Sequence, residues 1–386
     1  MDRTIAEKDG KLLLLLLDWS KAFDRIRTDS LLVALKRFGL PPLFVQMVGA
    51  IYSGRRFTVK DGRWESTHRE QASGVSQGCP LSPFLFSILM TVLFHDVDNH
   101  PTVCAANAAS HHRGFVVTDV LYADDTLLVD SDECRLQACL DCIIALGCEY
   151  GLTLNWDKTV LLRIRHEGSV KGPGGLEAKS QDSAIYLGGL LNTSGAATSE
   201  LTRRMGEAWG SLVKLESVWK HANITSDRKH LLLKSLIFPK LMYGLESVWL
   251  FVADRRRLNS FHVKCLRKAY GIKHSYVSHV SNAEVMAVAK AQQLSAQLLE
   301  TQLRLYGRIA MLDAQSPQRQ VALAPDSLRP ALSIHKARGR PRIAWAPTIY
   351  GHAVAAAGSE QLLREALSTD SWRGIVRKYC HRVGQA

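Results

Sequence analysis

The sequence predicts a chain in two parts, an α/β (α+β) half followed by an all-helical, basic half. In the first half, short apolar runs typical of strands alternate with longer runs of helical periodicity. From Ala196 onward the apolar residues recur at intervals of three and four, which indicates amphipathic helices. The charge changes at the same place, because residues 1–195 carry 20 Lys+Arg and 23 Asp+Glu, whereas residues 196–386 carry 29 and 13.

The first strand and the first two helices are marked by their boundaries. Residues 12–17 form an apolar run, ended by Asp18, that is too short to cross a membrane and predicts a strand buried on both faces. A helix over about 29–38 stops at Gly39, and Pro41-Pro42 opens a second helix.

Two turn signals predict hairpins. Asp61-Gly62 lies between two short alternating runs, and Tyr122-Ala-Asp-Asp125 lies between two apolar runs. Between them, a Gly-rich loop over 73–83 leads into an apolar helix over about 81–97. Residues 99–113, rich in Ala, His and Asn, are expected to form an exposed loop.

Further elements complete the predicted order. The first half continues with an amphipathic helix over 132–150, a strand over 159–164 and a strand around 185–190. The second half is predicted to hold helices from 196, over 225–238, over 240–270 with an interruption at Gly244, and over 282–313. We expect three domains, over residues 1–195, 196–313 and 314–386.

Two adjacent carboxylates, Asp124 and Asp125, occupy the tip of the second predicted hairpin. Neighbouring anions repel each other unless a cation neutralises them. Asp18 ends the buried strand, where an ionised carboxylate is costly unless it is paired or bound to a metal. Mg²⁺ takes oxygen ligands, and two such ions about 3.5 to 4 Å apart can stabilise a phosphoryl transfer. We therefore expect two Mg²⁺ ions at these residues, with Mn²⁺ as an alternative; a merely acidic turn is the other interpretation.

Five short segments rich in polar residues and glycine follow one another along the first half of the chain. They are Asp18-Trp-Ser-Lys-Ala-Phe-Asp24, Ser73-Gly-Val-Ser-Gln-Gly-Cys-Pro-Leu-Ser-Pro83, Tyr122-Ala-Asp-Asp125, Gly151-Leu-Thr-Leu-Asn-Trp-Asp-Lys-Thr159 and Tyr186-Leu-Gly188. Their order and spacing resemble motifs A to E of reverse transcriptases, in the style of LINE-like retrotransposons, which lack long terminal repeats. The resemblance implies an RNA-directed DNA polymerase, a nucleotidyltransferase that extends a primer 3′-hydroxyl. It also implies a palm of antiparallel sheet backed by helices, followed by a helical thumb and a C-terminal helical region.

The resemblance assigns roles to residues beside the three aspartates. Phe23 would sit where a ribose 2′-hydroxyl needs space, and Lys158 would lie near the leaving pyrophosphate as a general acid. Gln77 and Gly78 belong to a loop whose backbone can approach a nucleotide closely, and Tyr122 adjoins the carboxylates. A core Phe, an ordinary Gly-rich loop and a solvated Lys are the alternative interpretations.

A basic surface in the second half is expected to hold nucleic acid through its phosphates. Its predicted members are Arg203, Arg204, Arg255, Arg256, Arg257, Lys264, Arg267, Lys268, Arg338 and Arg340. The last two lie in Arg-Gly-Arg-Pro, a core sequence that can enter a narrow minor groove. A solubilising basic surface and a plain basic linker remain as alternatives.

The expected partners are an RNA template, a DNA primer and deoxynucleoside triphosphates. Only 17 residues precede Asp18, so we expect the fingers region of the resembled polymerases to be largely missing. An upstream fingers or endonuclease region of the same element is a further expected partner. A truncated, catalytically inactive nucleic-acid-binding remnant is the rival function. No run of 18 apolar residues occurs, so we expect no membrane partner and an intracellular location, in the nucleus or cytoplasm.

Overall fold

The computed structural model describes residues 4, 10–109, 118–221, 223–331, 344–369 and 371–384. The chain divides into two compact units, which we describe separately. The first holds residues 10–187 and 191–193, and the second holds residues 188–190 and 194–386. The boundary falls close to the predicted change at residue 195.

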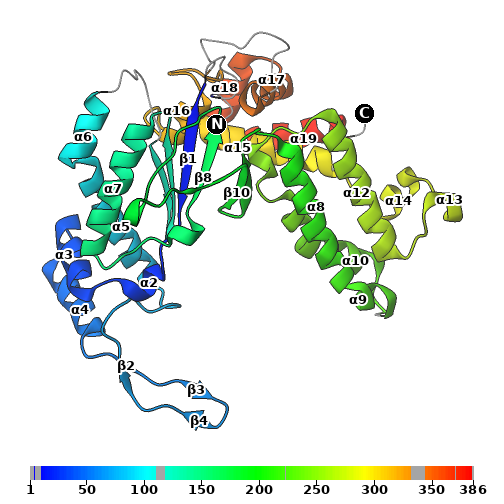
Figure 1. Cartoon of the computed structure of the whole chain (residues 1–386). Helices are drawn as coiled ribbons and strands as arrows, with labels where there is room; N and C mark the ends of the chain where they lie inside the picture. The colour runs from blue at the N-terminus through cyan, green and yellow to red at the C-terminus, as the bar shows by residue number, and fades with distance from the viewer. Residues whose placement is uncertain are drawn as a thin grey trace. The chain divides into compact units, whose positions relative to one another are not determined.

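A five-stranded sheet in the order β6-β7-β1-β8-β9 forms the centre of the first unit (Figure 1). Its strands are β1 (Leu12–Leu17), β6 (Asp119–Tyr122), β7 (Asp125–Asp130), β8 (Val160–Ile164) and β9 (Lys179–Gln181). The β6, β7, β1 and β8 strands pair antiparallel, as predicted, and the edge strand β9 pairs parallel to β8. The central strand β1 is buried from Leu13 to Leu17, because antiparallel partners flank it and helices cover it.

The helices of the first unit pack in one core with β1. They are α2 (Ala22–Arg25), α3 (Thr28–Phe38), α4 (Pro42–Tyr52), α5 (Ser82–Asp98), α6 (Pro101–Ala108) and α7 (Glu133–Glu149). The α3 helix ends at Gly39, whose φ of 95° gives the left-handed C-cap predicted for that glycine. Pro42 and Pro83 lie in the first turns of α4 and α5, where a missing N–H costs no hydrogen bond.

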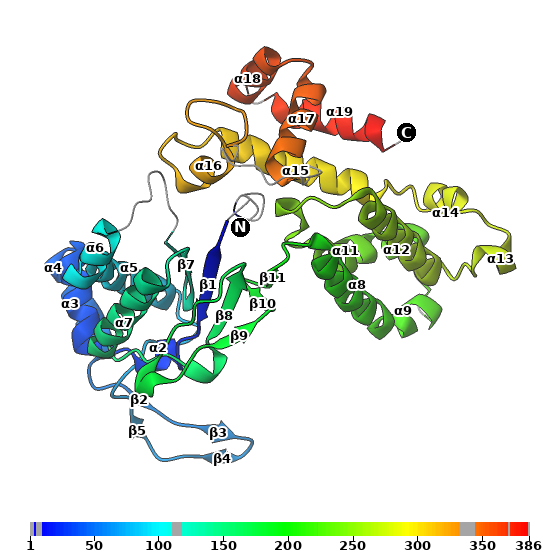
Figure 2. The same cartoon turned by 45° about the horizontal axis from the view of Figure 1, so that its top comes forward.

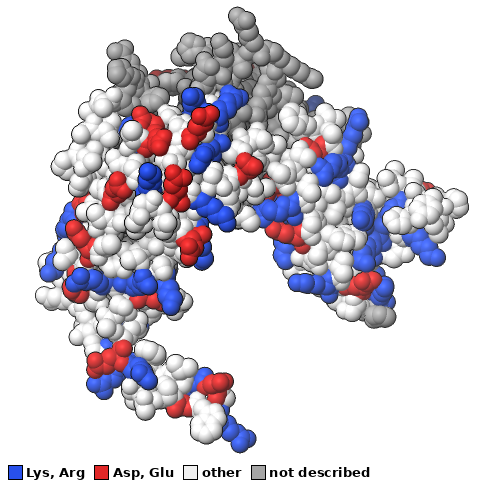
Figure 3. Space-filling view, in the orientation of Figure 1, with Lys and Arg blue, Asp and Glu red and all other residues white. Residues whose placement is uncertain are grey.

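An exposed arm of two short strand pairs separates α4 from α5 (Figures 1 and 3). Its pairs are β2 (Arg56–Phe57) with β5 (Arg69–Glu70), and β3 (Lys60–Asp61) with β4 (Trp64–Glu65). Gly62 turns the tip with a φ of 58°, as the Asp-Gly signal predicted. Acidic and basic side chains both lie along the arm, including the ion pair between Lys60 and Glu65.

Two predictions for the first unit were wrong. Residues 99–113 are not one loop, because α6 occupies Pro101–Ala108; Pro at the first helical position and the alanines that follow favour a helix. The strand expected around 185–190 is a hairpin of β10 (Ser183–Tyr186) and β11 (Gly189–Asn192). Leu187 and Gly188 form its turn with φ values of 48° and 73°, as two-residue hairpin loops require.

The second unit is helical, as predicted. Its elements are α8 (Ala197–Lys214), α9 (Glu216–His221), α10 (Ser226–Leu232), a π-helical turn (Leu233–Ile237), α11 (Phe238–Met242), a 3₁₀ turn (Leu245–Ser247), α12 (Val252–Tyr270), α13 (Ser275–Ser278), α14 (Asn282–Val288), α15 (Leu294–Ala310), α16 (Pro317–Ala322), α17 (Trp345–Ala357), α18 (Glu360–Ser368) and α19 (Trp372–Val383). None of the described helices combines the length and the apolar character needed to span a bilayer.

The predicted long helices are broken at identifiable residues. The helix expected over 240–270 is interrupted at Gly244, but it resumes only at Val252. The helix expected over 282–313 is split before α15, where Lys290 adopts a φ of 47°. A π-helical turn precedes Pro239, which has no N–H for a regular helical hydrogen bond.

Two cores fill the second unit, and α15 contributes to both. Leu294 and Leu298 belong to the core shared by α8, α11 and α12. Leu299, Leu303 and Tyr306 belong to the core shared by α17, α18 and α19. Figure 2 shows α15 running below α17. The domain boundary proposed at residue 313 therefore stays a prediction, since the helix before it serves both sides.

Candidate active site

Strand pairing places the aspartate that follows β1 beside the one that opens β7. Leu17 pairs with Thr126, so Asp18 and Asp125 lie at neighbouring strand ends. Asp124 lies in the turn between β6 and β7, where Ala123 takes a φ of 52°. Desolvation, followed by the charges of Asp124 and Asp18, raises the pKa of the Asp125 carboxyl. The three carboxylates therefore share one repulsive electrostatic environment.

This environment fits a cation by its chemistry. The donors are carboxylate oxygens, the ligands that Mg²⁺ prefers. A cation would favour the ionised form of Asp125, whose pKa is raised first by desolvation and then by the charges of Asp124 and Asp18. However, no three acidic, histidine or cysteine side chains in the described part of the chain are already gathered around one point. Asp18 and Asp125 thus lie at neighbouring strand ends, but the three aspartates do not form a complete set of metal ligands.

A buried hydrogen bond joins the two strands directly behind the aspartates. The Trp19 indole Nε1 donates to Thr126 Oγ1 at 3.2 Å, and both residues are buried. A Cβ at Gly147 of α7 would lie 3.1 Å from the Trp19 ring, so only glycine lets the indole pack here without displacement. The Asp18 carbonyl accepts a hydrogen bond from Asn155 N at 2.7 Å. These contacts hold the backbone of both aspartate-bearing strands.

Lys158 lies beside the same carboxylates. It ends a 3₁₀ turn, Trp156–Lys158, that leads into β8, and its Nζ is 3.6 Å from Asp18 Oδ2. The Lys158 side chain is 67% exposed, so this ion pair contributes little to stability. Its position leaves the ammonium group free to turn toward a bound anion.

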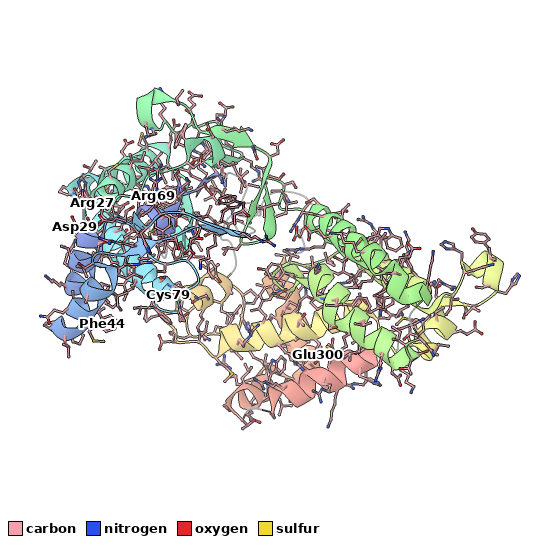
Figure 4. The ribbon with its side chains drawn as sticks, turned by 90° about the horizontal axis from the view of Figure 1, so that it is seen from below. Arg27, Asp29, Phe44, Arg69, Cys79 and Glu300 are labelled. Carbon is pink, nitrogen blue, oxygen red and sulfur yellow. The ribbon has the colours of Figure 1, made fainter. Side chains whose placement is uncertain are left out.

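The Gly-rich loop packs on the turn that follows Asp18. Val75 N donates to Phe23 O at 2.7 Å, and Ser73 Oγ donates to Asp24 O at 3.0 Å. A Cβ at Gly74 would lie 2.7 Å from the Asp24 carbonyl oxygen, so this close approach requires glycine. Figure 4 marks the loop at Cys79, just before α5.

The predicted nucleotide-binding residues occupy this loop and its surroundings. Gln77 Nε2 donates to Asp24 Oδ1 at 3.1 Å, and Gly78, with a φ of 84°, has no atom within 4 Å of where a Cβ would be. Phe23 is partly buried and stacks on Phe86 of α5 with ring centroids 4.5 Å apart. Tyr122 is 66% exposed and pairs with Asp125 at the hairpin end.

Tyr186 opens the last of the five motifs. Its hydroxyl donates to Val120 O in β6 at 2.7 Å. Desolvation and the charges of Asp125 and Asp119 raise the pKa of Tyr186 to about 12. Tyr186 therefore ties the β10–β11 hairpin to the strand that leads to the carboxylates. The sequence pattern gives no signal of this partner, because Tyr186 and Val120 lie far apart in the chain.

Most of the predicted basic residues have partners inside their own unit. Arg203 and Arg204 pair with Glu200, and both donate to the Gly188 carbonyl. Arg267 is buried and donates to the carbonyls of Lys273 and Val280. The buried guanidinium groups of Arg204 and Arg267 therefore serve the fold, which corrects their placement on an open surface.

The other predicted basic residues differ in how far they are engaged. Arg255 lies 3.8 Å from the Trp249 ring centroid, and Arg257 pairs with Asp254 at 3.1 Å. Lys268 pairs with Glu216, and Lys264 lies over the Trp209 ring at 4.1 Å. Arg256 is exposed, with no ion pair to another described residue. Arg338 and Arg340 lie outside the described residues.

The fold and the site together define a polymerase-type palm, in which carboxylates at strand ends adjoin a Gly-rich loop. Residues 2–190 match the family described as reverse transcriptase (RNA-dependent DNA polymerase), and this part of the chain belongs to that family. The match confirms the resemblance on which the palm was predicted.

Two curated relatives are retrotransposon proteins. The Pol polyprotein from the type-2 retrotransposable element R2DM of Drosophila melanogaster is 32% identical over 59% of this chain and 22% of its own length. The RNA-directed DNA polymerase from mobile element jockey of Drosophila funebris is 27% identical over 66% of this chain and 28% of its own length. This chain thus spans about a quarter of these relatives.

Solved structures give a weaker likeness. Apo telomerase from Candida tropicalis is 13% identical, with 76% of this chain and 46% of that chain covered and a TM-score of 0.36. A similarity of this size adds nothing to the family assignment.

Proposed function

We propose that this chain is the polymerising core of a reverse transcriptase from a retrotransposon without long terminal repeats. It would extend a DNA primer on an RNA template with deoxynucleoside triphosphates. The observation that carries the proposal is the register of β1 with β7, which brings Asp18 beside Asp125. The hairpin turn adds Asp124, and the pKa of Asp125 is raised by desolvation and then by the charges of Asp124 and Asp18.

Asp18, Asp124 and Asp125 would hold two Mg²⁺ ions, or Mn²⁺ in their place. When bound, the ions would meet the charge that develops on the attacking and leaving oxygens. Lys158, with its ammonium group 3.6 Å from Asp18, is positioned to donate a proton to the leaving pyrophosphate.

The residues beside the carboxylates would select and place the nucleotide. Phe23, held against Phe86, would exclude a ribose 2′-hydroxyl and so favour deoxynucleotides. The open backbone at Gly78 gives a sugar or phosphate room to approach, and Gln77 would then exchange its bond to Asp24 for one to the nucleotide or template base. Tyr122, exposed beside Asp125, would contact the primer end or the nucleotide.

The second unit would hold the template and primer by their phosphates. Arg256 and Lys264 are the exposed cations of α12 best suited to bind phosphates. Arg203, Arg257 and Lys268 would be available only after breaking their ion pairs with carboxylates. Arg338 and Arg340 would add a further nucleic-acid contact. An upstream fingers or endonuclease region of the same element would act with this chain, in the nucleus or cytoplasm.

Primer extension on an RNA template with Mg²⁺ tests the proposal. The wild-type chain should extend the primer, and Asp124→Asn should abolish extension while retaining nucleic-acid binding, because only the charge that holds the ion is lost. Asp61→Asn, the same substitution at the tip of the β3–β4 hairpin, is the matched control and should extend normally. A wild-type chain that binds the template and primer without extending them would identify the rival function, an inactive binding remnant.

A further inference from the structure

The C-terminal helix α19 has an apolar face and a cationic face, and both faces run along the whole helix. Side chains spaced by four residues lie in rows along a helix. The buried row is Trp372, Val376 and Cys380, and Ile375 and Tyr379 beside it are half-buried. The exposed rows are Arg373, Arg377 and His381, and next to them Gly374, Lys378 and Arg382.

The buried row fixes which face of α19 points outward. The Trp372 indole donates to Leu303 O of α15 at 3.1 Å, and a Cβ at Gly307 would lie 2.4 Å from the same indole nitrogen. Because α15 and α19 approach this closely, α19 cannot rotate about its axis, and its cationic rows remain exposed to solvent. Figure 2 shows α19 beside α15 and α17 at the C-terminal end of the chain.

The exposed rows carry no negative charge. The α19 sequence holds no Asp or Glu, and within the described residues Arg373, Arg377, Lys378 and Arg382 form no ion pair. The neighbouring helices differ, because Arg304 of α15 pairs with Glu300, which Figure 4 labels, and Arg364 of α18 pairs with Glu360. Like charges spaced by four residues destabilise a helix unless an outside anion offsets them.

We propose that this face of α19 binds the sugar-phosphate backbone of a nucleic acid. From Arg373 to Arg382 the helix rises about 14 Å, which is the axial length of roughly four phosphates of one duplex strand. Exposed Gly374, in the same row as Lys378 and Arg382, has no atom within 4 Å of where a Cβ would be, so a backbone can approach the helix closely. The inference adds a second contact surface to the proposed function, beyond the basic residues of α8 and α12.

Salt-dependent binding to a short RNA–DNA hybrid tests this assignment. Arg373, Arg377, Lys378 and Arg382 are replaced together by Gln in the full chain. The slope of log affinity against log salt should become shallower by roughly two to four units, and Kd at low salt should rise by about tenfold or more. The substitutions leave the buried row intact and remove repulsion, so the variant should fold, and its thermal unfolding is measured alongside.

A charge-conserving variant provides the matched control. Arg373→Lys, Arg377→Lys and Arg382→Lys together should retain the wild-type salt slope, because a phosphate responds to charge. If the Gln variant binds the hybrid with wild-type affinity and slope, or if the Lys variant fails equally, the proposal is wrong. The proposal would also be wrong if the Gln variant lost binding to anionic phospholipid vesicles while its binding to the hybrid stayed unchanged. The readout is binding, so a chain that fails to extend primers leaves this result fully interpretable.

Discussion

The two units of the chain use charge in opposite ways. In the first unit, Asp18, Asp124 and Asp125 stand at strand ends, where they repel one another. In the second unit, many cations are already satisfied by carboxylates, carbonyls and aromatic rings, as at Arg204 and Arg267. Uncompensated charge marks a site that awaits a ligand, whereas a count of charged residues does not reveal which of them are available.

The largest expected effect comes from the clustered carboxylates. Asp125→Asn should lower the rate of primer extension by about 10²- to 10³-fold, the scale seen when one group that meets transition-state charge is removed. Because the Asp125 pKa is raised, the ionised carboxylate destabilises the fold above its ordinary pKa range. The variant should therefore unfold at a higher temperature at neutral pH than wild type, and this gain should vanish in acid. Lower stability together with lower activity would contradict the assignment.

The next effect concerns stability and compares a buried ion pair with an exposed one. Glu200→Ala removes the partner of buried Arg204 and should lower the free energy of unfolding by about 3 kcal/mol in a denaturant titration. Burial opposes ionisation of Glu200, but hydrogen bonds from Arg203 and Arg204 hold its pKa below the ordinary value of 4.5. The stabilisation should be complete above that value and be lost as pH falls through the lowered pKa. The exposed partner Glu207, changed to Gln, should cost far less.

A smaller effect tests the bond behind the carboxylates. Trp19→Phe keeps an aromatic ring but removes the indole N–H, so the buried Thr126 hydroxyl loses its donor, which should cost about 1 to 2 kcal/mol of stability. It should also lower kcat with little change in KM, because the strand ends that carry Asp18 and Asp125 lose their tie. Trp156→Phe is the control, since its buried Nε1 has no partner among the described residues. Equal losses from both substitutions would mean that ring packing alone matters.

The smallest effect on stability belongs to the exposed cations of α12. Arg256→Gln and Lys264→Gln should each change the free energy of unfolding by less than about 0.5 kcal/mol. Each should make the salt dependence of nucleic-acid binding shallower by about one unit. Arg267→Gln should do the reverse, lowering stability with an unchanged salt slope, because its buried guanidinium group donates to the carbonyls of Lys273 and Val280. If all three substitutions changed stability and salt slope equally, the distinction between buried and exposed cations would be wrong.

Sequence reasoning was strongest where backbone rules act locally. The apolar run before Asp18 predicted a buried strand. Gly39 and Gly62 predicted a helix end and a turn, because glycine adopts a positive φ at little cost. The reverse transcriptase motifs then gave the fold and the family. Helix breaks at Lys290 and the hairpin at Leu187 were missed, because non-glycine residues with positive φ leave no clear signal in a pattern of apolar residues.

The candidate site was predicted as a set of residues but not as a set of contacts. Neither the Trp19–Thr126 bond nor the bond from Tyr186 to Val120 follows from spacing, because each joins residues far apart in sequence. The basic surface was overestimated for the same reason, since the partners of Arg204 and Arg267 appear only when helices and loops pack. A register relates two strands at once, and the linear pattern holds no information on it until the fold is given.

The sharing of α15 between two cores limits how this chain can be divided or recombined. A cut at residue 313 would strip Leu299, Leu303 and Tyr306 of the helices that cover them, and a cut before α15 would remove Leu294 and Leu298 from the other core. Neither half can therefore be exchanged as an independent module. The C-terminal helices and the thumb-like helices should be inherited together and should melt in a single transition, as one cooperative unit.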